Sequence, residues 1–502
     1  MSKPLLLRKL PHLIFTLIIS LITFSLIQLK TADATVVSST SFTNPLTPGA
    51  DASITFKDGY YYYVKTQGSY IDVFKTKSLV DLEHATGKRV YTPTTATPSA
   101  SQEIWAPEIH LINNKWYIYF AADDGSDINH RIYALEGNTA DPQGAYTFKG
   151  KVYDKANDTW AIDQTVFTHS DGKLYMLWSG RATNSLSQPQ NIYIAQMSNP
   201  YTLSSKRVLI SSPTYSWEKV GSYVNEGPEV LQHGGKTFVI YSASFFNTPD
   251  YKLGMLTYRG GNVLSSASWS KSSTPVFQKT ATVFGPGHNT LATSNDGSEN
   301  WIIYHARNTT STDEPRTIRA QKFSWNATTG APIFGTPVAT TTAVLLPHGD
   351  VLGDLVIDSF ILTDASGTAK TTFTEGEPIY PKVILHNIGG LGVDTPTNST
   401  LTEFYADAPG SLPKSTPSDV NVYLKNGEFP AEFSKEYAAS PVGQNNSFYQ
   451  GAKSWTKTAG TYTARAFIDY DYAGVESSYA NNQVVMTYTV VPSLTTSPTP
   501  TP

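Results

Sequence analysis

The chain has 502 residues, no cysteine, a net charge of −4 and only 16% charged residues. This length allows about two to four domains. The lack of cysteine excludes disulfides, thiolate metal sites and cysteine nucleophiles. The weak charge provides neither a basic field for nucleic acid nor an acidic tail. The counts of Tyr (30), Phe (22) and Trp (9) suit a carbohydrate-binding protein, because sugar C–H faces stack on aromatic rings, but packing between strands also explains them.

Residues 1–34 are predicted to be a signal peptide. Three basic residues precede an apolar run, Leu13–Leu29, and Ala32-Asp33-Ala34 has the small-residue pattern of a cleavage site. We therefore expect a mature chain that starts near Thr35 and is secreted or held at a bacterial cell surface. The apolar run is long for a signal peptide, so an uncleaved anchor is the alternative.

Residues 35–350 contain five copies of one hairpin, each with a strand rich in β-branched and aromatic residues, a polar turn and a second strand. A polar residue leads each copy, and the leading residues lie 55 to 63 positions apart: Asp51, Glu108, Asp163, Glu226 and His288. A strand-only repeat of this period predicts a five-bladed β-propeller. The innermost strands of a propeller converge on one channel, so these five residues are expected to form a ring at its mouth. The segments near 41–44 and 344–346 are expected to close the propeller.

Residues 351–492 lose the repeat and show alternating strands at 355–362, 379–386, 420–424, 461–468 and 484–491. Their spacing predicts an immunoglobulin-like β-sandwich. Residues 493–502 are rich in Pro and Thr and are expected to be an extended linker. The expected fold class is therefore all-β, with a propeller followed by a sandwich.

The acids of the ring have the composition of a glycosidase site. Hydrolysis of a glycosidic bond needs one carboxylic acid that protonates the leaving oxygen and a second carboxylate that activates water or attacks carbon. A third acid nearby raises the pKa of the first by repulsion. Asp51, Asp163 and Glu226 are the candidates. A single acid at a loop end is more often a cap or turn residue, but three in phase with a repeat favour a shared site.

The motifs ADASI (Asp51), WAPEIH (Glu108), AIDQTVF (Asp163), VNEGPEV (Glu226) and GPGHN (His288) together resemble glycoside hydrolase family 43 over residues 42–348. The resemblance implies a five-bladed propeller and inverting hydrolysis of arabinose- and xylose-containing glycans. It implies that Asp51 is the general base, Glu226 the general acid and Asp163 the modulator of the acid's pKa. One departure is Ala52, where the family usually has proline.

Further site residues are predicted around these acids. Trp105 and Glu108 are expected to contact the sugar, as are Arg307 and Arg316, which follow the last hairpin. No cofactor is expected to be required. In similar proteins a histidine at the place of His288 lies near a channel cation, often calcium, usually through water. The alternative is a histidine that is only hydrogen-bonded in the channel lining.

The C-terminal segments KVILHNIGG (382–390) and VESSYANNQ (475–483) resemble the cell-adhesion-related bacterial (CARDB) domain. That resemblance implies an immunoglobulin-like spacer and attachment to a cell surface, with carbohydrate binding as the alternative.

The sequence thus predicts a secreted α-L-arabinofuranosidase that acts on plant cell-wall arabinan or arabinoxylan and has no nucleic-acid partner. A β-xylosidase or an endo-arabinanase is the near alternative. A non-catalytic propeller that binds glycans or mediates adhesion is the alternative of another class.

Overall fold

The computed structural model describes residues 41–83 and 85–350 and, in the C-terminal part, residues 355–387, 393–395, 400–409, 420–424, 427–429, 434–438, 447–449, 454–468 and 482–493. The predicted signal peptide and nearly all of the predicted linker lie outside these residues. Within them, every regular element is a strand except four short 3-10 turns: Pro98–Ala100, Asp127–Asn129, Ser216–Glu218 and Ser266–Ser268. The all-β prediction is confirmed. The described part of the chain has no helix that is long and apolar enough to cross a membrane.

Residues 47–333 form five antiparallel sheets, numbered here in chain order. The first contains β3 (Ser53–Lys57), β4 (Tyr60–Val64), β5 (Ile71–Thr76) and β6 (Thr86–Tyr91). The second contains β7 (Gln102–Ile112), β8 (Lys115–Asp123), β9 (Arg131–Gly137) and β10 (Tyr146–Lys151). The third contains β11 (Ala161–Thr168), β12 (Leu174–Gly180), β13 (Asn191–Asn199), β14 (Thr202–Leu203) and β15 (Val208–Ser211).

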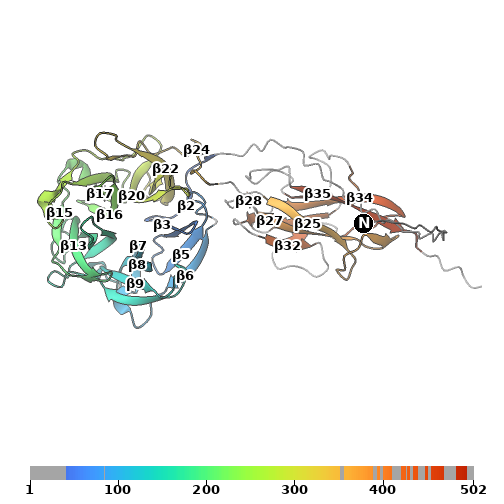
Figure 1. The fold of residues 1–502 in the computed structure, drawn as a ribbon, viewed down its shortest axis with the longest axis horizontal. Helices are drawn as coiled ribbons and strands as arrows, with labels where there is room; N and C mark the ends of the chain where they lie inside the picture. Colours follow the sequence, from blue (N-terminus) through green and yellow to red (C-terminus); the bar gives the residue numbers. More distant parts are fainter. Residues whose placement is uncertain are drawn as a thin grey trace, which may run out of the picture. The chain divides into compact units, whose positions relative to one another are not determined.

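The fourth sheet contains β16 (Asn225–His233), β17 (Lys236–Ala243), β18 (Lys252–Tyr258) and β19 (Trp269–Lys271). The fifth contains β20 (Phe284–Thr293), β21 (Asn300–Arg307) and β22 (Thr317–Trp325), with β2 (Thr47–Pro48) and β23 (Pro332–Ile333) at its edge. The predicted hairpins are the pairs β3–β4, β7–β8, β11–β12, β16–β17 and β20–β21, and each predicted turn lies between its two strands. Figure 1 shows the sheets set around a central axis, with β3, β7, β16 and β20 innermost. The fold is a β-propeller.

Neighbouring sheets are held together by buried hydrophobic side chains. These side chains lie on the faces that each sheet turns toward the sheets beside it. One cluster joins each consecutive pair of sheets, and another joins the fifth sheet to the first. Members contributed by adjoining sheets to one cluster include Val73 and Ile118, Tyr119 and Met176, Leu177 and Val239, Ile240 and Ile302, and Trp301 and Tyr63. The core is therefore a closed ring of interfaces around the axis.

The two ends of the propeller region meet, as predicted, but they do so twice. β1 (Ser41–Phe42) pairs with β24 (Val344–Leu345) in a two-stranded sheet of its own. The strand that joins the fifth sheet is instead β2, which pairs with β22. Asn44 adds to this closure, because its side-chain amide exchanges two 2.9 Å hydrogen bonds with the backbone of Ala320 and so mimics a strand pair.

The C-terminal part contains the five strands predicted from its alternation. A three-stranded sheet has the order β25 (Leu355–Thr363), β27 (Tyr380–Asn387), β32 (Ser434–Ala438). A six-stranded sheet has the order β26 (Thr372–Thr374), β35 (Gln483–Val491), β34 (Gly460–Ile468), β29 (Thr400–Tyr405), β30 (Val420–Leu424), β33 (Ser447–Tyr449). β28 (Val393–Thr395) pairs separately with β31 (Gly427–Phe429). One core contains side chains of both larger sheets, including Val383 and Phe404.

Candidate active site

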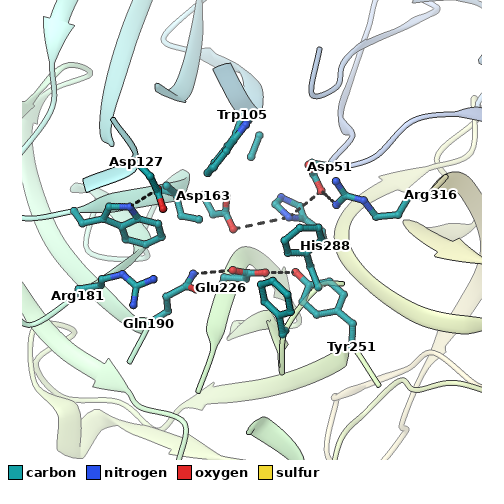
Figure 2. Close-up of a pocket in the computed structure, with 15 residues that line it drawn as sticks. Asp51, Trp105, Asp127, Asp163, Arg181, Gln190, Glu226, Tyr251, His288 and Arg316 are labelled. Atoms are coloured by element: carbon teal, nitrogen blue, oxygen red, sulfur yellow. Dashed lines mark hydrogen bonds and ion pairs between the residues drawn. The ribbon is translucent and has the colours of Figure 1, made fainter. Parts of the chain in front are cut away.

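A pocket of about 410 Å³ opens at the propeller axis. It is lined by residues of all five hairpins, among them Asp51, Trp105, Asp163, Glu226 and His288. Figure 2 shows Asp51 and Arg316 on one side of this pocket, Gln190 and Arg181 on the other, and Glu226 between them. The pocket thus brings together side chains that are far apart in the chain.

The backbone explains which residues reach the pocket. Near the start of each inner strand a residue at a matching position has a positive φ: Asp51 (58°), Ala106 (39°), Asp163 (52°), Gly227 (51°) and His288 (47°). In β7 and β20 a second residue with a positive φ lies three positions earlier: Glu103 (45°) and Gly285 (60°). In four of the sheets the residue at the matching position lies where the pairing register shifts, as in a β-bulge. Such left-handed residues are uncommon outside glycine and mark bends that re-aim side chains. We therefore define the ring position of each sheet as the residue at which its inner strand bends.

This register corrects two members of the predicted ring. In the fourth sheet the ring position is Gly227, and Glu226 lies one residue before it but still lines the pocket. In the second sheet the ring position is Ala106, and Glu108 lies two residues farther along β7, outside the pocket lining. There its Oε2 lies 2.8 Å from the Nε2 of His110, at hydrogen-bond distance. Burial raises the pKa of Glu108 well above its usual value. The structure thus places this predicted sugar contact outside the pocket lining, at the position that Glu229 occupies in the fourth sheet.

Asp51 is surrounded by groups that favour its ionised form. Arg316 donates a 3.1 Å hydrogen bond to Oδ1, and Thr66 donates a 2.8 Å bond to Oδ2. Ring nitrogens of His305 and His288 lie 3.2 and 3.3 Å from Oδ1. Burial acts to raise the pKa of Asp51, but Arg316 and the two histidines outweigh it and hold that pKa well below its usual value. Asp51 is therefore a carboxylate under all ordinary conditions.

Glu226 has the opposite environment. It lies one residue before the left-handed Gly227 and is 7% exposed, and the charge of Arg316 acts on it only weakly compared with burial. Gln190 donates to Oε2 at 2.7 Å and Tyr251 donates to Oε1 at 2.9 Å. Burial, reinforced by the charge of Asp51, raises the pKa of Glu226 to about 7, although these two hydrogen bonds oppose the rise. Glu226 is therefore a carboxylic acid in mildly acidic solution.

Asp163 stands between these two acids. The backbone N–H of Gly227 donates a 3.1 Å hydrogen bond to its Oδ2, and the Nδ1 of His288 lies 3.9 Å away. Burial and the charges of Glu226 and Asp51 raise the pKa of Asp163 well above its usual value. The two neighbouring acids, Asp163 and Glu226, therefore retain a proton between them.

The remaining predicted residues divide into two groups. Trp105 and Arg316 line the pocket; the indole of Trp105 stacks on His130 at 4.1 Å, which fixes the ring as one wall. Arg307 does not line it. Its guanidinium donates to the carbonyl of Glu314 at 2.7 Å and to Asn247 at 2.9 Å, so it ties together two loops beside the pocket.

Nine pocket residues were not predicted, and five of them carry polar groups: Tyr251, Gln190, Trp160, Arg181 and Asp127. These five lie in loops or a 3-10 turn just outside the long strands, where the hairpin repeat carries no signal. The guanidinium of Arg181 lies 4.4 Å over the ring of Trp160, whose Nε1 donates to Asp127 at 3.1 Å. The register of the ring, by contrast, has a signal in the sequence, because APEI at 106–109 and GPEV at 227–230 align directly.

His288 faces the acids and is buried, which lowers its pKa, so it is neutral and able to accept or donate one hydrogen bond at each nitrogen. Calcium prefers six to eight oxygen ligands. Among the described residues no group of three or more histidine and acidic side chains has the geometry to hold a metal. The calcium expectation at His288 stays a prediction.

A pocket that holds one buried carboxyl ionised and another protonated has the two functional groups that glycoside hydrolysis requires. The chain belongs to glycosyl hydrolases family 43, whose family model matches residues 42–329. It is a glycosidase.

Relatives and solved structures agree with this assignment. The chain is 40% identical over 323 residues to an extracellular exo-α-(1→5)-L-arabinofuranosidase of Streptomyces avermitilis, a match that spans 61% of this chain and 66% of that protein. It is 38% identical to a protein of the same name from Streptomyces chartreusis, over 50% of this chain and 77% of that one. The crystal structure of an α-L-arabinofuranosidase from Lactobacillus brevis is 37% identical, with a TM-score of 0.56, over 60% of this chain and 98% of that one.

Proposed function

We propose that this chain is a secreted, inverting α-L-arabinofuranosidase that releases terminal arabinofuranosyl residues from arabinan or arabinoxylan. The observation that carries the assignment of roles is the opposite protonation of Asp51 and Glu226 in one pocket. Two carboxyl groups with pKa values driven apart by their surroundings identify the base and the acid of a hydrolase. Two relatives with the word extracellular in their names support secretion.

The mechanism follows from these states. Asp51 takes a proton from a water whose oxygen attacks the anomeric carbon of the bound sugar. As the glycosidic C–O bond breaks, Glu226 gives its proton to the leaving oxygen. Inversion needs space for that water between the two carboxyl groups, on the order of 6.5–9.5 Å. The volume of the pocket, about 410 Å³, supports such an arrangement.

Asp163 is proposed to modulate the acid. The N–H of Gly227 holds its carboxyl group beside Glu226, and the mutual repulsion of two buried carboxylates keeps one proton on the pair, which Glu226 can donate. Trp105 is proposed as the face on which the sugar ring stacks, and Arg316 as a donor shared between Asp51 and a sugar hydroxyl.

The first experiment replaces Glu226 with Gln and uses Glu229→Gln as a matched control, since Glu229 is a half-buried glutamate of the same strand that does not line the pocket. We expect E226Q to lower kcat/KM on arabino-oligosaccharides about 10²- to 10⁴-fold, the usual contribution of a general acid. The loss is smaller for 4-nitrophenyl arabinofuranoside, whose leaving group needs less protonation. Full activity of E226Q with both substrates would refute the assignment.

The substrate class is tested with three substrates: 4-nitrophenyl arabinofuranoside, 4-nitrophenyl xyloside and linear arabinan. Release of arabinose without shorter oligosaccharides supports exo action, faster xyloside cleavage indicates a β-xylosidase, and internal cuts indicate an endo-arabinanase. Retention on arabinan without any released sugar indicates a glycan-binding propeller. The anomer that appears first in a proton NMR time course separates inversion from retention.

At the level of domains, we infer that the five sheets are the five blades of the propeller over residues 35–350 and that residues 351–492 form an immunoglobulin-like, CARDB-like sandwich. The common core of the two larger C-terminal sheets supports the second inference. Attachment to a cell surface through this part is a proposal from the CARDB resemblance alone. A structural calcium ion would be detected by elemental analysis of dialysed protein with and without chelator.

A further inference from the structure

Exposed aromatic side chains lie together beside the active-site pocket. Among the described residues, four Phe or Tyr side chains are exposed, and all four belong to two loops that adjoin the fourth sheet. One loop, residues 212–224, precedes β16, and the other, residues 244–251, joins β17 to β18. The four side chains, which we call the aromatic band, are Tyr215, Tyr223, Phe245 and Phe246, and they are 36, 54, 38 and 36% exposed.

The two loops are bonded to each other, so the band is one surface. The backbone N–H of Phe245 donates a 2.9 Å hydrogen bond to the carbonyl of Val220, and the hydroxyl of Ser244 donates to the carbonyl of Trp217 at 2.8 Å. Gly221 lies at this junction with a φ of 77°, and a Cβ there would lie 3.0 Å from the Cβ of Phe245. The close approach of the loops therefore depends on a glycine at this position.

The band is continuous with the pocket. Phe245 and Phe246 line the pocket as well as being exposed, and their ring centroids lie 4.9 Å apart. The carbonyl of Tyr223 accepts a 3.1 Å hydrogen bond from the backbone N–H of Gln190, whose side chain bonds Glu226 (Figure 2). The band thus begins in the pocket and continues outside it, beside the residues that hold the acid.

The reaction brings the remainder of the substrate to this side. The oxygen that accepts the proton of Glu226 stays with the leaving sugar, so that sugar lies within hydrogen-bond reach of Glu226 in the substrate complex. Both donors to the acid adjoin the band, because Tyr251 ends the β17–β18 loop and Gln190 contacts the backbone of Tyr223. The aromatic band is therefore the surface that the next sugars of the chain reach as they leave the pocket on this side.

The chemistry of the band fits a carbohydrate chain. Aromatic rings stack on the C–H faces of sugars, and the small polar residues between these rings, such as Ser222 and Asn247, can bond sugar hydroxyls. The ammonium of Lys219 lies 5.3 Å over the ring of Tyr223. Lysine is depleted in the dry core of protein interfaces, so its place in the band favours a hydrated sugar ligand over a protein partner.

We propose that the aromatic band binds sugar residues on the leaving-group side of the scissile bond and so makes the enzyme prefer a polysaccharide or long oligosaccharide to a short substrate. The choice of arabinan and arabinoxylan as ligands rests on the proposed function. The surface itself rests on the exposure of the four rings and their continuity with the pocket.

The test compares Tyr223→Ala with Ile333→Ala. Tyr223 does not line the pocket. Ile333 is the control because it is 47% exposed and lies in β23, at the edge of the fifth sheet and outside the pocket lining. Phe246 is left intact, since its ring lies 4.9 Å from the guanidinium of Arg316 and its loss would also disturb Asp51. Thermal unfolding of each variant shows whether it is folded.

Binding is measured by affinity electrophoresis in native gels that contain linear arabinan or arabinoxylan, with E226Q as the background so that the polymer stays intact. We expect the apparent dissociation constant to rise about three- to tenfold in Tyr223→Ala, the loss of one stacked ring, and to stay unchanged in Ile333→Ala. With active enzyme, Tyr223→Ala should lower the ratio of kcat/KM on arabinan to kcat/KM on 4-nitrophenyl arabinofuranoside by a similar factor.

A second variant, Tyr215→Ala, decides the test if Tyr223→Ala does not fold. Equal retention of the band variants and Ile333→Ala in the gels overturns the proposal. So does a dimer in sedimentation velocity that Tyr223→Ala dissociates, because a second copy of the chain would then cover the band. The gels need no hydrolysis, so their result stands whether the pocket cleaves arabinosides or xylosides, and equal retention leaves the proposed function intact.

Discussion

The hydroxyl of Tyr251 offers a sharp test of how the pocket controls its acid. It donates a 2.9 Å hydrogen bond to Oε1 of Glu226, and this bond lowers a pKa that burial raises to about 7. Tyr251→Phe removes the donor but keeps the ring, which stacks on His305 at 5.6 Å. The variant should therefore have a higher Glu226 pKa and stay active at higher pH than the wild type.

The magnitude follows from the two states of the acid. A hydrogen bond to a charged group is worth about 1 kcal/mol more than the same bond to a neutral one, and 1.36 kcal/mol corresponds to one pKa unit. The alkaline limb of kcat/KM, with its wild-type midpoint at about 7, should move upward by roughly one pH unit. At pH 8 the protonated share of Glu226 then rises from about one tenth to about one half. The plateau should fall, because the acid is less firmly oriented.

The assay is the pH dependence of kcat/KM on an arabino-oligosaccharide between pH 5 and 9. Tyr304→Phe is the control, since Tyr304 is another buried tyrosine and its hydroxyl bonds Gln321, outside the pocket. Its limb should coincide with that of the wild type. A folded Tyr251→Phe enzyme whose limb is unmoved, or displaced to lower pH, would show that Glu226 is not the group that titrates there.

Two further changes test the base and the framework. Arg316→Met removes the charge that most lowers the pKa of Asp51, so that pKa should rise and the acid limb of kcat/KM should move toward neutral pH. If the limb measured between pH 3 and 6 does not move, Asp51 is not the base. Lys271→Met leaves the fully buried carboxylate of Glu218 without its 2.8 Å partner, and should lower the free energy of unfolding by about 3–5 kcal/mol. Denaturant melts measure this loss, and a change below about 1 kcal/mol would show that the remaining hydrogen bonds of Glu218 suffice.

Local patterns in the chain were enough to predict the hairpins. Alternating β-branched and aromatic residues around turns such as Asp58-Gly59 and Asp171-Gly172 specify strand, turn and strand from nearest neighbours alone. The repeat of that unit predicted a propeller, and the acids that lead three of its copies, Asp51, Asp163 and Glu226, do line one pocket, although Glu226 lies one residue before the position that Asp51 and Asp163 occupy.

Local patterns did not predict which residue of each inner strand takes the ring position. Glu108 was placed in the ring because it precedes an apolar run, but the bend at Ala106 moves the ring position two residues earlier. Tyr251 and Gln190 carry no repeat signal, since they reach Glu226 from loops. Only packing of the sheets decides such contacts.

The sequence by itself determined which residue types are available: strands that repeat, turns that fold them back, and three carboxylic acids that lead repeats. The tertiary structure decided what those acids do. Asp51 and Glu226 carry the same chemical group, and they differ because Arg316, 265 residues along the chain from Asp51, bonds that carboxylate directly, whereas burial outweighs the more distant charge of Arg316 at Glu226. Charge and burial act through space, so neighbours distant in the chain set the protonation of each acid.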